Sequence, residues 1–121
     1  MKNISVDDLI GLLMTANHVY LCGNGGSAAN AIHIANDLVS VGIRAHPLTA
    51  DVATLTAIAN DYGYEFVFSR QLAVFAQRGD LLIVLSGSGN SENILQALAS
   101  AKHLGIPSIA IASCRFWVPL T

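Results

Sequence analysis

LLIVLSGSGNS, residues 81–91, is the stretch that decides the fold. Its five apolar residues, 81–85, are typical of a strand buried on both faces of a parallel sheet. A loop of serines and glycines follows, and an amphipathic helix pattern then runs from Ser91 to Leu104. This order places unpaired backbone N–H groups at a helix start, which suits a phosphate or carboxylate.

A second loop of the same kind lies upstream. Gly23-Asn-Gly-Gly-Ser27 stands between an apolar run, 19–22, and a helix pattern over 27–41 that Ser27 is expected to cap. Further strands are predicted over 44–49 and 108–112, and further helices over 5–17, 51–59 and 65–77. Strands alternate with helices, which predicts a three-layer, doubly wound parallel α/β sheet of the flavodoxin-like kind. Both loops then lie at carboxyl ends of strands, where they are expected to hold one ligand.

Composition bounds the class of protein. The chain has 121 residues, 53% apolar and 12% charged, with a net charge of −2. These values predict one α/β domain with no basic surface for nucleic acid. No apolar run approaches the ~20 residues of a membrane span, and no signal peptide precedes Asp7, so a cytoplasmic protein is expected. Cys22 and Cys114 have no metal spacing and are interpreted as reduced core residues.

Three common motifs are excluded. Neither loop is a P-loop, because no Gly-Lys-Ser/Thr sequence follows the glycines. The first lacks the third glycine of a dinucleotide fingerprint, with Ala28 in its place. Gly87-Ser-Gly89 is too short for a nucleophile elbow. An oxyanion-binding site therefore remains the favoured interpretation of the loops.

The helix over 27–41 carries a second candidate site. Its apolar residues predict one buried stripe: Ala28, Ala31, Ile32, Ala35, Leu38 and Val39. His33 and Asp37 fall on the opposite side, four residues apart, so their side chains are neighbours. Periodicity alone favours a solvated face with a weak ion pair. The alternative is a metal-binding or acid/base pair, since imidazole and carboxylate both ligate zinc.

The ordered set of motifs resembles the SIS (sugar isomerase) domain and, within it, the phosphoheptose isomerases. The resemblance covers about residues 5–112. Its motifs are Cys22-Gly-Asn-Gly-Gly-Ser27, His33-Ile-Ala-Asn-Asp37, Ala59-Asn-Asp-Tyr-Gly63, Phe68-Ser-Arg-Gln71, Gly79-Asp80 and Ser86-Gly-Ser-Gly-Asn-Ser91.

The resemblance implies a sugar-phosphate ligand and assigns residues to it. The implied phosphate ligands are Ser86, Gly87, Ser88 and Ser91. The implied sugar contacts are Asn24, Gly25, Gly26 and Ser27, with Asn60 and Asp61 nearby. His33 and Asp37 are implied zinc ligands, and Asp37 is also the implied catalytic acid/base. Homotetramers with active sites at subunit interfaces are implied as well.

The implied reaction converts sedoheptulose 7-phosphate to D-glycero-D-manno-heptose 7-phosphate, a precursor for surface polysaccharide. Two departures from the family pattern bear on it. Position 37 is Asp where Glu is usual, and after residue 112 the sequence lacks the family's last strand and its helix with a glutamine and a histidine. The chain is expected to be a C-terminally truncated SIS domain, with an N-terminal helix over 1–17, a phosphosugar-binding core over 18–112 and an atypical end over 113–121.

Two other functions stay open at this point. One is a non-enzymatic SIS scaffold that binds the replication initiator DnaA. The other is a sensor that binds a sugar phosphate without turnover. Zinc content distinguishes the scaffold from the isomerase, and affinity without turnover marks the sensor.

Overall fold

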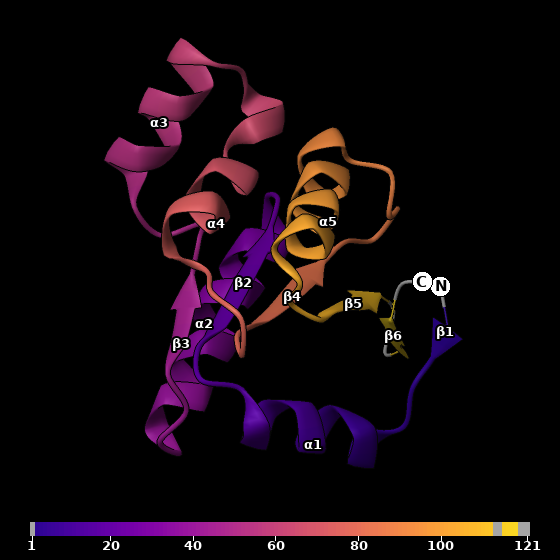
Figure 1. Ribbon diagram of the computed structural model, residues 1–121. Coiled ribbons are helices and arrows are strands. Elements are labelled where there is room, and N and C mark those ends of the chain that lie inside the picture. Colours follow the sequence, from indigo (N-terminus) through magenta and orange to yellow (C-terminus); the bar gives the residue numbers. More distant parts are fainter. Residues whose placement is uncertain (1, 113–114, 119–121) are drawn as a thin grey trace.

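The computed structural model describes residues 2–112 and 115–118 as one sheet with helices on both faces (Figure 1). The elements, in chain order, are β1 (Lys2–Asn3), α1 (Val6–Thr15), β2 (Val19–Gly23), α2 (Gly26–Ser40), β3 (Ala45–Pro47), α3 (Val52–Asp61), η1 (Tyr64–Phe66), α4 (Ser69–Phe75), β4 (Leu81–Leu85), α5 (Glu92–Leu104), β5 (Ser108–Ala112) and β6 (Arg115–Val118). Within the described ranges, no helix is long and apolar enough to cross a lipid bilayer.

The strand order is β1-β6-β5-β4-β2-β3. The four strands from β3 to β5 are parallel, as predicted, and β3 lies at an edge. The sheet also has an antiparallel edge that the sequence did not predict, because β6 runs antiparallel to β5 and β1 runs antiparallel to β6. Only two residues separate β5 from β6, and a parallel return would need a crossover of a dozen or more. β6 and β1 thereby cover the edge that β5 would otherwise expose.

Alternate strand residues divide the core between the two faces. Leu21 and Ile83 face the side covered by α1 and α2, whereas Tyr20 and Val84 face the side covered by α4 and α5. Figure 1 shows the strands between these two groups of helices. β2 and β4 are buried along their whole lengths, as expected for strands covered on both faces.

Side-chain and glycine caps set several boundaries as predicted. Ser5 and Asp8 form a capping box at the start of α1, and Asp51 accepts a hydrogen bond from the Thr54 backbone N–H at the start of α3. Gly105, in the left-handed conformation, ends α5.

The start of α2 differs from the prediction. Gly25, with φ of +57°, is the N-cap, and Ser27 lies inside the first turn. The positive φ turns the chain two residues earlier than a serine cap would. The predicted stripe is also only partly correct, because Ala31 and Ala35 are buried while Ile32 is 41% and Val39 55% exposed. Small residues let α2 lie close to the sheet, and Ile32 and Val39 lie at the sides of this contact.

The region 60–77 differs as well. Asn60 and Asp61 are the last residues of α3 rather than its breakers, and Gly63, with φ of +122°, follows them. The helix predicted over 65–77 is divided into η1 and α4. Within α4, Phe68 at the N-cap and Leu72 are buried, whereas Phe75, the last residue of the helix, is exposed.

Candidate functional site

The two predicted loops meet at the carboxyl ends of the parallel strands. The first loop is residues 24–26, after β2, and the second loop is residues 86–90, after β4. The register pairs Gly23 with Leu85, so the loops begin side by side. From β2 the chain passes to β3 on one side and then to β4 on the other, which makes this the switch point of the parallel sheet. Ligands of open α/β sheets bind in the crevice at such a point.

Glycines give the first loop its shape. A Cβ on Gly23 would lie 2.8 Å from Ser27 Cβ and 2.9 Å from the Leu85 carbonyl oxygen, so only glycine fits between the strands there. A Cβ on Gly25 or Gly26 would meet no atom within 4 Å. The backbone of these two residues is therefore open to a ligand at the N-terminus of α2, where the helix dipole favours negative charge.

The second loop is held by its own serines. Ser86 Oγ accepts a hydrogen bond from the Gly89 N–H at 2.8 Å, and Ser88 Oγ accepts one from the Asn90 N–H at 3.2 Å. Because each hydroxyl uses a lone pair here, its O–H proton stays available to an anion. Ser91 is the N-cap of α5, yet its side chain makes no capping hydrogen bond. A Cβ on Gly87 would meet no atom within 4 Å.

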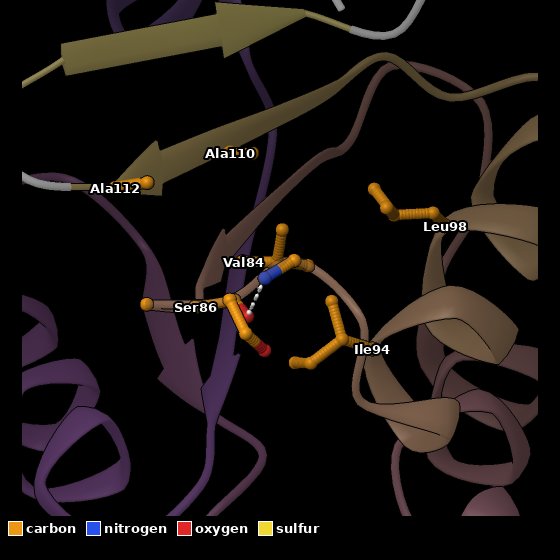
Figure 2. A pocket seen from close by; sticks show the side chains of 9 residues that line it. Val84, Ser86, Ile94, Leu98, Ala110 and Ala112 are labelled. Atoms are coloured by element: carbon orange, nitrogen blue, oxygen red, sulfur yellow. Dashed lines mark hydrogen bonds between the residues drawn. The ribbon is translucent and has the colours of Figure 1, made fainter.

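A hollow of about 180 Å³ lies beside the second loop (Figure 2). Its lining comes from the loop and from β4, β5 and α5: Val84, Ser86, Gly87, Ser88, Gly89, Ile94, Leu98, Ala110 and Ala112. Figure 2 shows Ser86 at one wall and Ile94 and Leu98 on the α5 side. The aliphatic walls leave the loop as the polar part of the hollow.

A second hollow, of about 350 Å³, lies between the first loop, η1 and the start of α5. It is lined by Asn24, Tyr64, Glu65, Ser91, Glu92 and Asn93. Asn24 and Asn93 exchange a pair of amide hydrogen bonds of 2.8 and 2.9 Å, and the Tyr64 hydroxyl donates to Asn24 Oδ1 at 2.8 Å. The first loop is thereby joined to η1 and to the first turn of α5.

The pair on α2 lies apart from the loops. His33 Nε2 and Asp37 Oδ2 are 3.4 Å from each other, and the side chains are 77% and 63% exposed. Asp37 is eleven positions beyond Gly26, which corresponds to ~16 Å along a helix. The chain alone therefore does not bring Asp37 to the ligand loops.

The comparisons with known proteins agree with this geometry. The SIS domain family matches residues 5–113. The chain belongs to the SIS domain family. A phosphoheptose isomerase of Campylobacter concisus is 45% identical over 106 residues, which are 83% of this chain and 56% of that protein.

Solved SIS structures give the same result. The phosphoheptose isomerase of Neisseria gonorrhoeae has a TM-score of 0.81 and 40% identity, over 88% of this chain and 58% of that one. The sugar isomerase domain of an RpiR transcription factor from Sphaerobacter thermophilus has a TM-score of 0.64 and 28% identity, over 88% and 52%. The predicted family and fold are confirmed, and the chain spans little more than half the length of these relatives.

Three other predicted SIS site residues, Ser27, Asn60 and Asp61, line neither hollow. Asn60 and Asp61, at the end of α3, are exposed and bond to each other at 3.0 Å. Ser27 lies in the first turn of α2, and its N–H donates to the Asn24 carbonyl oxygen at 2.9 Å. The assignment of these three residues to a ligand stays a prediction.

The donor set on α2 is incomplete for the zinc ion implied by the SIS resemblance. Imidazole and carboxylate are suitable ligands, but zinc sites use three or four protein ligands. No cluster of three His, Cys, Asp or Glu side chains that could hold a metal occurs in the part of the chain that the structure describes. These residues therefore do not by themselves fit the ion.

Cys22 is too deeply buried to contact a ligand at the loops. The side chain is completely buried, and desolvation raises the pKa of its thiol well above the usual range. Cys22 is thus a core residue, as predicted. Cys114 lies outside the described residues.

Two residues of the site were missed from the sequence, Asn93 and Tyr64. Asn93 shares a helix face with Ala97 and Ala101, both buried, so its position at helical spacing from the core was a signal. A polar side chain on a buried face needs a partner. Tyr64 gave no such signal, because its partner is 40 residues away.

Proposed function

We propose that this chain carries the phosphosugar-binding part of a phosphoheptose isomerase, which converts sedoheptulose 7-phosphate to D-glycero-D-manno-heptose 7-phosphate for surface polysaccharide. The observation that carries the proposal is the meeting of two open, glycine- and hydroxyl-rich loops at the switch point of the sheet. Relatives that are about 45% identical are named phosphoheptose isomerases, and this name supports a phosphoheptose as the substrate.

In this proposal the phosphate binds at the second loop. Ser86 and Ser88 donate their O–H protons to it, Ser91 adds a third hydroxyl at the start of α5, and the open backbone at Gly87 lets the anion approach. The α5 dipole adds a partial positive charge. The sugar carbons then extend past Ser91 toward Asn24, through the larger hollow that these two residues help to line.

The reaction needs a base at the sugar carbons. The base takes a proton from C1 of the open-chain ketose, a proton is returned at C2, and one hydroxyl proton moves from O1 to O2, so no oxidant or reductant is consumed. We propose Asp37 as this group. Because Asp37 lies ~16 Å along α2 from the loops of its own chain, it would act at the loops of a second copy, in a homotetramer.

Zinc is proposed as a cofactor with two ligands from this chain, His33 and Asp37. The remaining ligands would come from outside the described residues. No step is assigned to the ion, since the donor set of the described residues does not complete its site.

The test is turnover of sedoheptulose 7-phosphate by the purified chain, with and without zinc. Asp37→Asn should abolish turnover while keeping sugar-phosphate affinity, and Asp7→Asn on the exposed side of α1 is its control. Ser88→Ala should weaken binding, and Ser100→Ala, farther along α5, should not.

Each other outcome changes the conclusion. Turnover that survives Asp37→Asn would exclude Asp37 as the base. If the wild-type chain binds the sugar phosphate saturably but neither it nor any variant turns it over, a sugar-phosphate sensor would be favoured over an isomerase. If the wild-type chain shows no binding and no turnover, this result would contradict the phosphosugar site and favour a scaffold.

A further inference from the structure

Three side chains from distant parts of the sequence meet at one amide. Asn24 follows β2, Tyr64 belongs to η1 and Asn93 lies in the first turn of α5. Asn24 Nδ2 donates to Asn93 Oδ1 at 2.8 Å, and Asn93 Nδ2 donates back to Asn24 Oδ1 at 2.9 Å. The Tyr64 hydroxyl donates to the same Oδ1 at 2.8 Å. The lengths are those of well-formed hydrogen bonds.

These bonds use all but one of the hydrogen-bonding positions of Asn24. A side-chain amide has two lone pairs on oxygen and two N–H protons on nitrogen. Both lone pairs of Asn24 are occupied, by Asn93 and Tyr64, and one N–H is occupied by Asn93. A single N–H remains. Asn24 therefore meets a ligand in the hollow as a donor only.

The two partners fix this orientation in different ways. Asn93 is 3% exposed, so its amide is held among core residues and breaking the pair would leave buried polar groups unsatisfied. Tyr64 is 59% exposed and contributes its hydroxyl with little packing. Together they prevent Asn24 from rotating to present its oxygen instead.

We propose that Asn93 and Tyr64 are positioning residues that aim the remaining N–H of Asn24 at the carbonyl oxygen of an open-chain sugar phosphate. This rests on the proposed function and assigns roles within that site. A donor suits a carbonyl oxygen, and it suits the enediolate oxygen of the isomerisation still better, because its hydrogen bond strengthens as negative charge develops. A phosphate on the second loop does not need it.

The first test removes one hydroxyl. Tyr64→Phe should weaken sedoheptulose 7-phosphate binding about tenfold, equal to ~1.4 kcal/mol, in calorimetric titration. It should leave the affinity for inorganic phosphate and the melting temperature unchanged. Tyr62→Phe is the matched control, because Tyr62 is 55% exposed and stacks on Arg70 rather than bonding to Asn24. Unchanged sugar-phosphate affinity in Tyr64→Phe, or an equal loss for inorganic phosphate, would overturn the proposal.

The second test replaces the donor of the buried partner. Asn93→Asp keeps an acceptor for Asn24 Nδ2, but its carboxylate cannot donate to Asn24 Oδ1. A protonated carboxyl group can, so the ratio of variant to wild-type affinity for the sugar phosphate should recover as the pH is lowered from 8 to about 4, near the usual carboxyl pKa of ~3.9. A ratio that does not change with pH would contradict the role proposed for the Asn93 donor, and equal recovery of the affinity for inorganic phosphate would point to a merely structural role. Absence of any sugar-phosphate binding by the wild-type chain would instead contradict the proposed function itself.

Discussion

The first and second loops are alike in composition and differ in what holds them. The first loop is bound through the Asn24 side chain to residues 40 and 69 positions away. The side-chain hydrogen bonds of the second loop, from Ser86 and Ser88, stay within the loop and span two or three residues. Both lie at the same edge of the sheet, so the difference does not come from the strands that carry them.

The difference separates two tasks in the proposed site. An anion has many equivalent acceptor positions, so a loop with local bonds and free hydroxyl protons can bind it without one fixed orientation. A sugar carbonyl must be met from one direction, and a donor already fixed by the fold loses less entropy on binding. The long-range bonds therefore lie at the loop where orientation matters.

The largest expected effect is on the packing that brings the two loops together. Gly23→Ala places a Cβ 2.8–2.9 Å from Ser27 and the Leu85 backbone, so one of the two strand ends must shift. Such overpacking costs about 1–3 kcal/mol of unfolding free energy. Urea unfolding measures it.

Gly87→Ala is the matched change in the second loop. Its Cβ would meet no atom within 4 Å, so the unfolding free energy should stay within ~0.5 kcal/mol of wild type. Equal losses in the two variants would show that the two loops are packed alike.

A smaller effect is expected from the amide network. In a double-mutant cycle, Asn24→Ala and Asn93→Ala should each destabilise the chain, with a coupling of about 0.5–3 kcal/mol because they share two hydrogen bonds. The cycle of Asn24→Ala with Ser86→Ala should be additive within ~0.5 kcal/mol. Urea unfolding of the wild type and the five variants measures both couplings, and coupling to Ser86 as large as that to Asn93 would remove the distinction between the loops.

The sequence predicted the parts of this site that depend on local chemistry. The apolar run 81–85, the loop after it and the helix to Leu104 were correct because strand burial, glycine and serine composition and the Gly105 stop are all readable over a few residues. The parallel arrangement of β2, β3, β4 and β5 followed from strand–helix alternation. The family then confirmed the fold.

The features that the sequence did not predict depend on which residues lie close together in the folded chain. The antiparallel β6 follows from a two-residue connection, which a pattern search for helices and strands does not weigh. The Tyr64–Asn24 bond joins side chains that only the fold brings together. The remoteness of Asp37 from the loops also needed the structure, because periodicity gives the face of a helix and not what lies beside it.

Removal of a loop hydroxyl should change the unfolding free energy still less, but it should change the affinity for phosphate more. Ser86→Ala loses one hydrogen bond of the second loop, to the Gly89 N–H, and should cost less than ~1 kcal/mol of unfolding free energy. If the same hydroxyl donates to the phosphate, affinity for inorganic phosphate should fall about tenfold, as expected for a hydrogen bond to a charged group. Calorimetric titration measures this loss, and Ser100→Ala is the control. A variant that binds phosphate like the wild type would remove Ser86 from the anion site.

The smallest effect is a pH dependence of stability. It comes from residues near the amino ends of β2 and β4, at the end of the sheet opposite the two loops. There His18 Nδ1 and His46 Nε2 are 2.8 Å apart, beside the Tyr20 ring and near Asp80, which accepts from the His18 backbone N–H. Burial, and then His18, lower the pKa of His46, and Asp80 acts against them. In the unfolded chain the imidazole has its usual pKa near 6.5.

The sign of the pH effect follows from these values. Below about pH 6.5 the unfolded chain binds the proton of His46 more readily than the folded chain, so stability is full above this pH and decreases as the pH falls through the lowered folded pKa. The loss should be small, because His46 is largely exposed. His46→Gln should flatten the dependence of unfolding free energy on pH between 5 and 7.5, whereas His103→Gln on α5 should not. The serine, glycine and asparagine groups of the two loops do not titrate in this range. A pH dependence that persists in His46→Gln would therefore have to come from other ionisable groups, and the two loops would still have to be compared at a single pH.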